Sequence, residues 1–145
     1  MDIISIILTV FVVLEVSNVI MLYFVPGTTK GNGMGAFVTY EKVKKDPEVY
    51  ALVDYLINWV AGTKLIFILL LIGIIILGTP LIKIFSICAL IVSVATFYFR
   101  LYPSIKKMDR DNLIKPKGYS KTLGLMIGIF IFMFIIALIF FLIFN

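Results

Sequence analysis

The stretch that decides the fold is residues 46–77, DPEVYALVDYLINWVAGTKLIFILLLIGIIIL. Its opening is typical of a helix start, because Asp46 can cap free amides, Pro47 is tolerated in the first turn and Glu48 favours the positive end of the helix dipole. At ~1.5 Å per residue this helix would be about 48 Å long, too long to be only a membrane span. We therefore predict a span over residues 56–77 that is preceded by a polar cytoplasmic extension.

The composition is that of an integral membrane protein. Of the 145 residues, 62% are hydrophobic and only 14% are charged, whereas about a quarter of a soluble domain is charged. One Cys and no His exclude an intrachain disulfide and a Cys/His zinc cluster, so we predict no metal site and no cofactor. The net charge of +5 does not indicate nucleic acid, because the basic residues flank apolar segments.

Four apolar segments predict an all-α fold, a single four-helix membrane domain over residues 1–145. The predicted spans are residues 3–25, 56–77, 81–102 and 122–144, and the two longer loops are residues 26–46 and 103–121. Ten of the thirteen Lys and Arg residues lie in these two loops. The positive-inside rule therefore places both loops in the cytoplasm and both termini outside the cell membrane. The basic loops also suit anionic headgroups of the lipid bilayer.

The first of these loops is rich in glycine and then becomes amphipathic. Residues 31–35, GNGMG, lack the preceding strand and the full spacing of a phosphate-binding motif, which favours a flexible connector. Residues 36–45 place apolar side chains at helical spacing between charged ones. This pattern predicts a short amphipathic helix on the cytoplasmic membrane surface.

Polar residues inside the predicted spans define the candidate site, because an ionised side chain at the bilayer centre costs at least ~2.5–3.5 kcal/mol. Glu15 lies just past the middle of the first span, with Asn18 on the same face. Lys64 lies at a similar depth in the second span, and pairing it with Glu15 would remove most of this cost. Asp54 and Asn58 fall in the same helical sector as Lys64.

The third span carries a second polar stripe. Its members are Ser86, Ala89, Ser93, Thr96 and Arg100. Small and hydroxyl-bearing residues suit a tightly packed interior face on which hydroxyls donate across helices. The two stripes predict a polar seam between the first three spans, which widens toward the cytoplasm so that Asp54 and Arg100 can meet. Lys83, near the outer end, is predicted to be an anchor.

The fourth span has no charged residue and carries Gly124 and Gly128 in the small-xxx-small pattern, which lets helices approach closely. Packing within the protomer and contact between protomers are both open interpretations of this pattern. Because a single chain with four spans leaves little room for a pathway, we predict a homo-oligomer with this span as its contact.

The polar site favours transport, through an oligomeric transporter or a channel. Glu15 would exchange a proton or bind a cation, Asn18 would be an uncharged ligand, and Lys64 would be a competing internal cation. A carboxylate in the first of four membrane helices, Glu15-Val16, resembles the small multidrug-resistance exporters over this one helix. The resemblance implies chemistry of the same kind, and no family is identified across the whole chain.

Two other functions compete with transport. In a membrane accessory or interaction protein, the buried charges would only fix which helices pack together. A lipid-modifying membrane enzyme would need a nucleophile, an acid–base pair or a metal cluster near the interface. Carboxylates are present at the cytoplasmic face, but they form no known motif, so we predict that the protein is not an enzyme and has no catalytic residue.

Overall fold

The computed structural model describes residues 1–144, which are all-helical apart from their loops. The elements in order are α1 Ile3–Phe24, the 3-10 turn η1 Met34–Ala36, α2 Val38–Val43, α3 Pro47–Leu77, α4 Pro80–Arg110 and α5 Tyr119–Phe144. Helices α1, α3, α4 and α5 are each long and apolar enough to cross a membrane. The prediction of an all-α chain with four such helices is confirmed for the residues described.

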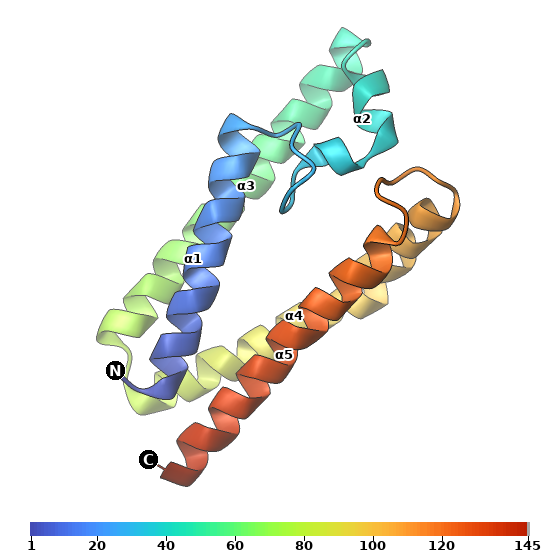
Figure 1. Ribbon diagram of the computed structural model, residues 1–145. Helices are drawn as coiled ribbons and strands as arrows, with labels where there is room; N and C mark the ends of the chain where they lie inside the picture. Colours follow the sequence, from blue (N-terminus) through green and yellow to red (C-terminus); the bar gives the residue numbers. More distant parts are fainter. Residues whose placement is uncertain (145) are drawn as a thin grey trace.

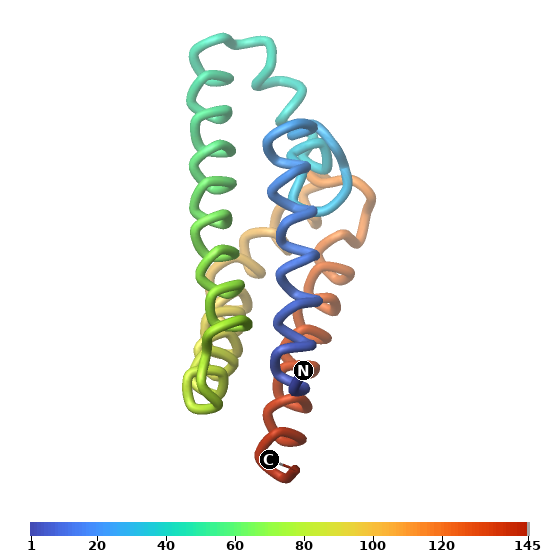
Figure 2. Tube along the Cα trace, turned by 90° about the vertical axis from the view of Figure 1, so that its left-hand side faces the viewer, coloured from blue at the N-terminus to red at the C-terminus, as the bar shows by residue number. Residues whose placement is uncertain are grey.

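The four long helices form two pairs that converge at one end (Figure 1). Helix α1 packs along α3, and α4 packs along α5. The two pairs meet near the short turn between α3 and α4 and diverge toward the longer loops. Both termini lie at the converging end, and both longer loops lie at the opposite end, as Figure 2 also shows. This is the grouping of loops and termini that a four-span topology requires.

Helix α1 holds the two pairs together, because it contacts α3, α4 and α5. Phe11 of α1 lies edge-to-face against Phe67 of α3, at 6.2 Å between ring centroids. It meets Phe130 and Phe134 of α5 in the same way, at 5.8 and 5.3 Å, and Phe134 is fully buried. Such aromatic pairs contribute about 0.5–1.5 kcal/mol beyond the area that they bury. Phe11 therefore lies at the centre of the core.

The loops at the diverging end bind each other and bridge the two helix pairs. The Val38 amide donates to the Leu113 carbonyl at 2.9 Å, and the Lys115 amide donates to the Ala36 carbonyl at 2.8 Å. These bonds flank an isolated antiparallel bridge between the segment that follows α1 and the segment that follows α4. The two pairs are thus tied together at both ends of the molecule.

The glycine-rich loop, for which the sequence predicted a flexible connector, forms a compact turn. The amides of Met34 and Gly35 donate to the carbonyls of Pro26 and Thr28, at 2.7 and 2.9 Å. A Cβ atom at Gly33 would overlap the Thr28 carbonyl, and one at Gly35 would overlap another backbone carbonyl. Glycine is needed at these two positions because backbone segments approach closely there.

The helix predicted over residues 36–45 is shorter in the structure. Only Val38–Val43 forms an α-helix, and η1 precedes it. Tyr40 on α2 is buried in the core cluster that α1 and α3 share. The apolar side of α2 therefore packs against the protein itself. Its polar side carries an exposed ion pair between Lys44 and Glu41, at 2.8 Å.

The predicted start of α3 is confirmed. The predicted end of the third apolar segment, which forms α4, is wrong. The Asp46 side chain accepts hydrogen bonds from the first amides of α3, as expected of a helix cap. Helix α4 does not end at residue 102 but continues through Pro103 to Arg110. A proline inside a helix removes one backbone hydrogen bond. Here the buried side chains of Ile105 and Asp109, two and six residues beyond Pro103, anchor the continuation by packing and by hydrogen bonding.

The Gly124–Gly128 face of α5 is occupied by α4 of the same chain. A Cβ atom at Gly124 would lie 2.8 Å from the Tyr102 ring, and one at Gly128 would lie 3.0 Å from the Tyr98 hydroxyl. That hydroxyl donates to the Gly124 carbonyl at 2.6 Å. Of the two interpretations that the sequence left open, packing within the protomer is the one observed, so this face is not free for a second copy. The fourth apolar helix also begins at Tyr119 rather than at residue 122.

Candidate functional site

The two ionisable residues that were expected to pair form an ion pair between α1 and α3. The Lys64 ammonium donates a hydrogen bond to Oε2 of Glu15. The side chain of Lys64 is 24% exposed and that of Glu15 is 16% exposed, so both charges are largely withdrawn from the surface. Ala61, one turn before Lys64, is fully buried. This small residue permits the close approach of helices that the pair requires.

The ion pair lies in an open cavity of about 620 Å³ between α1, α3 and α4. Apolar side chains make up most of the wall, among them Phe11, Phe67 and Trp59. Trp59 and Ser93, on α3 and α4, are exposed, whereas Phe11 on α1 is buried. The cavity therefore opens between α3 and α4, and α1 forms its floor. Its volume falls within the roughly 300–1,000 Å³ that is usual for small-molecule sites.

Each charge in the cavity keeps hydrogen-bonding capacity that the protein does not use. Lys64 has three N–H donors, and its bond to Glu15 is its only side-chain hydrogen bond within residues 1–144. The second carboxylate oxygen of Glu15 accepts none in that range. No side-chain polar atom there is both fully buried and without a partner. The unused positions are therefore open to the cavity or the surface, where a ligand can reach them.

The other polar residues predicted for the seam do not join this pair. Asn18 lies beside the glycine-rich loop, where a Cβ atom at Gly31 would be 2.5 Å from its amide oxygen. Asn58 is exposed and donates to the Asp54 side chain at 3.1 Å, within α3. Arg100 is exposed on α4, and no ion pair within residues 1–144 joins it to Asp54. Helices α3 and α4 diverge toward the longer loops (Figure 1).

The hydroxyl stripe of α4 is also different from the prediction. Ser86 is buried, but its hydroxyl donates to the Ile82 carbonyl of its own helix at 2.7 Å. The Thr96 hydroxyl donates to the Ser93 carbonyl at 2.6 Å, and Thr96 is exposed. A hydroxyl in a helix reaches the carbonyl three or four residues earlier without needing a partner helix. Ser93 is the one member of the stripe that lines the cavity.

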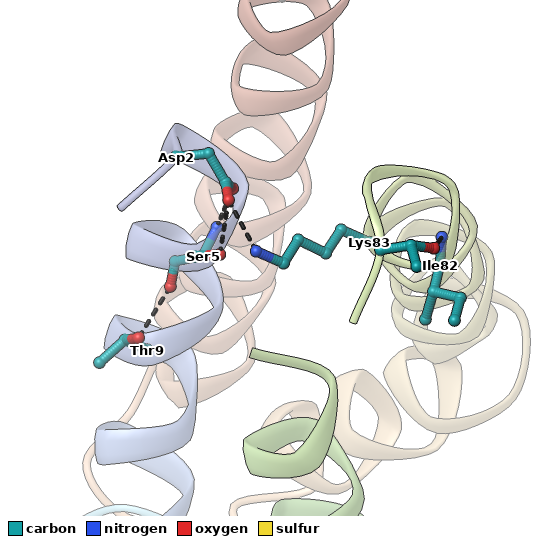
Figure 3. A network of polar contacts seen from close by, with 6 residues as sticks. Asp2, Ser5, Thr9, Ile82 and Lys83 are labelled. Atoms are coloured by element: carbon teal, nitrogen blue, oxygen red, sulfur yellow. Dashed lines mark hydrogen bonds and ion pairs between the residues drawn. The ribbon is translucent and has the colours of Figure 1, made fainter. Parts of the chain in front are cut away.

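A second ion pair, which the sequence analysis missed, lies at the converging end. Asp2 caps α1 by accepting from the Ser5 amide at 2.8 Å, and it also binds the Lys83 ammonium of α4 at 2.7 Å (Figure 3). Burial alone would raise the pKa of Asp2, but the hydrogen bonds from Lys83 and Ser5 lower it to about 2. An Asp directly before a helix and three residues before a Ser was the available signal. Lys83 is a structural partner of α1 rather than only an anchor.

A buried carboxylate organises the start of α5. Asp109, in the last turn of α4, accepts hydrogen bonds from the Gly118 amide at 3.0 Å and from the Ser120 hydroxyl at 2.6 Å. The Ser120 amide donates as well, at 3.0 Å. The bonds from Ser120 and Gly118 hold the pKa of Asp109 below its usual value. Because an anion at a helix N-terminus satisfies free amides and the helix dipole, Asp109 caps α5 from another helix.

Together these features define a class: an all-helical protein with four candidate membrane-spanning helices, three of which enclose a partly buried ion pair. Within residues 1–144, no group of three or more His, Cys, Asp or Glu side chains could hold a metal ion. Comparison of the chain with protein-family models, with curated proteins and with solved structures gave no match. The function is therefore argued from the site alone.

Proposed function

We propose that this chain is a multi-pass protein of the cell membrane and acts as a transporter or channel whose pathway passes the Glu15–Lys64 pair. The observation that carries the proposal is an ion pair with unused hydrogen-bonding positions in an open, mainly apolar cavity. Intramembrane ionisable residues usually belong to substrate or ion pathways. A substrate can enter between α3 and α4 without disrupting the core around Phe11.

The proposed orientation places both longer loops in the cytoplasm and both termini outside. The grouping of the loops at one end supports it, because ten of the thirteen Lys and Arg residues then lie on one side. These basic residues would also bind anionic lipid headgroups, each contributing about 1 kcal/mol near the surface. A homo-oligomer remains part of the proposal, but its contact must lie on a face other than the one of Gly124 and Gly128.

The two charged residues have different parts in the proposed pathway. Glu15 binds a cationic group or exchanges a proton, because its second oxygen is free to accept. Lys64 is the resident partner that a substrate must displace. The neutral ion pair is thus the resting state, in which neither charge is left without a partner.

The experiment that tests transport uses purified protein in liposomes with three readouts: proton flux, monovalent-cation flux and movement of a fluorescent phospholipid between leaflets. We expect at least one readout to exceed that of empty vesicles and to be lost in Glu15→Gln. The matched control is Asp2→Asn, which removes a carboxylate from the other interhelical ion pair. Wild-type protein that is active in none of the three readouts would refute the proposal.

The alternative is an accessory membrane protein, and one observation favours it. The Glu15–Lys64 bond is the ion pair that joins α1 to α3. In this alternative its whole role is to select α3 as the packing partner of α1. In that case Lys64→Met alone would misfold, whereas Glu15→Gln combined with Lys64→Met would fold normally. No transport readout would depend on either residue.

A further inference from the structure

We infer that the ligand of the Glu15–Lys64 cavity is a zwitterionic phospholipid that enters sideways from the bilayer. Its ammonium group would bind Glu15, its phosphate would bind Lys64, and its chains would follow the apolar walls between α3 and α4. This inference rests on the proposed function, since it names the class of substrate for the same site. It also accounts for a cavity in which two opposite charges face an almost wholly apolar space.

Charge balance is the main argument for a zwitterion. When a ligand separates Glu15 from Lys64, each residue needs a new partner of opposite charge. A purely cationic amphiphile would satisfy Glu15 and leave Lys64 unpaired, and an anionic one would do the reverse. An unpaired charge is costly at this depth. A zwitterion replaces both partners at once, so the site is neutral with and without its ligand.

The unused hydrogen-bonding positions match the same ligand. The Lys64 ammonium has two N–H groups left to donate to phosphate oxygens, and ammonium groups bind phosphate well. The free oxygen of Glu15 can accept from a ligand ammonium group. A bare metal ion fits poorly, because hard cations take about six or more oxygen ligands and the cavity provides a single carboxylate.

The position and size of the cavity favour a ligand from the bilayer over one from water. Its mouth lies between α3 and α4, and two of the residues that line it, Trp59 and Val60 of α3, are exposed apolar side chains. Glu15 lies nine residues before the end of α1, a distance of about 13 Å along the helix. A headgroup held there is between the two leaflets. The cavity of about 620 Å³ has room for a headgroup and the adjoining parts of the chains, while the rest of the chains stay in lipid.

Trp59 provides a direct test, because it is the only tryptophan of the chain and it lines the cavity. The protein is reconstituted in vesicles of equal phosphatidylethanolamine and phosphatidylglycerol. In one sample the bromine atoms, which quench tryptophan fluorescence, are on the zwitterionic lipid, and in the other they are on the anionic lipid. Because the two bilayers have the same headgroups, the ratio of quenching measures which lipid is enriched beside Trp59.

We expect the zwitterionic lipid to quench Trp59 more strongly in the wild type. In Glu15→Gln combined with Lys64→Met, the ratio should fall to one, because neither charge of the headgroup then has a partner in the cavity. The charge-swapped variant, Glu15→Lys with Lys64→Glu, should keep the wild-type ratio, because a zwitterion can bind in the reverse orientation. Asp2→Asn combined with Lys83→Met is the matched control and should also keep it. Circular dichroism confirms that each variant is folded.

Three results would overturn the inference. The first two are a quenching ratio of one in the wild-type protein and a ratio that favours the anionic lipid. The third is an unchanged ratio in Glu15→Gln combined with Lys64→Met. These results are separable from the transport assay. Headgroup selection without any transport would leave the ligand assignment standing and refute the transport function. Cation flux that depends on Glu15, together with a quenching ratio of one, would support the transport function and refute the ligand assignment.

Discussion

Replacing Gly124 with Ala is expected to destabilise the protein, whereas the same change at Gly73 is expected to stabilise it. Both glycines lie inside long helices, where Ala is favoured over Gly by about 0.8–1.0 kcal/mol. At Gly73 no atom lies within 4 Å of the new Cβ, so the whole gain is kept. At Gly124 the Cβ lies 2.8 Å from the Tyr102 ring. Overpacking of this kind costs about 1–3 kcal/mol, which leaves a net loss of about 0–2 kcal/mol.

The free energies of unfolding of Gly73→Ala and Gly124→Ala should therefore differ by about 1–3 kcal/mol. The measurement is loss of helical circular dichroism as SDS is titrated into protein in mixed micelles. A second pair checks the steric cause, because the Cβ of Gly128→Ala would meet only the Tyr98 hydroxyl. In a Tyr98→Phe background, Gly128→Ala should therefore stabilise the protein about as much as Gly73→Ala does. Equal stability of Gly73→Ala and Gly124→Ala would refute the packing of α5 on α4 described above.

Three further predictions concern the buried carboxylates and the glycine-rich loop. Wild-type stability should fall as the pH drops below about 4 and through the lowered pKa of Asp109. Asp109→Asn should be less stable at neutral pH, and its stability should change less with pH. SDS titrations at several pH values would show both effects. Gly33→Ala should cost about 1–3 kcal/mol, because its Cβ overlaps a carbonyl, and faster tryptic cleavage at Lys30 would report the loosened loop. Glu15→Gln and Lys64→Met should each cost about 3–5 kcal/mol and together less than their sum, and purely additive losses in a double-mutant cycle would contradict the pairing.

Apolar composition was sufficient to predict the helices but not where they end. A run of about twenty apolar residues forms a helix in almost any packing, so the four long helices could be placed from the sequence. The end of α4 could not, because the continuation past Pro103 depends on Asp109 reaching Ser120 in the following helix. The compact loop at Gly33 depends on the close approach of two backbone segments. Such contacts are tertiary, and local pattern does not encode them.

The sequence predicted the residues of the candidate site for which an unpaired charge would cost much free energy. It did not predict the positions of residues for which that cost is small. Glu15 and Lys64 could be paired from sequence because two isolated opposite charges at the same depth of an apolar span each avoid a large free-energy cost by pairing. Asn18 and Arg100 carry no comparable constraint. An amide or an arginine near a helix end can form its hydrogen bonds with water or with a loop, so its partner cannot be predicted. The apolar segments placed them on the correct helices, but neither these segments nor helical phase could show that α3 and α4 diverge.

The two interhelical ion pairs explain why α1 contacts both α3 and α4. Apolar faces discriminate poorly between helices in a membrane, because lipid chains are as apolar as leucine. In the proposed membrane location, helix α1 would select its neighbours through Asp2 and Glu15, whose lysines, Lys83 and Lys64, come from α4 and α3. The carboxylates are thirteen residues apart, about 20 Å along α1, so one pair fixes the converging end and the other lies toward the diverging end. Only the second of them lies in the cavity between α3 and α4, so the bond that selects α3 as a neighbour is also the bond that a ligand in that cavity can open.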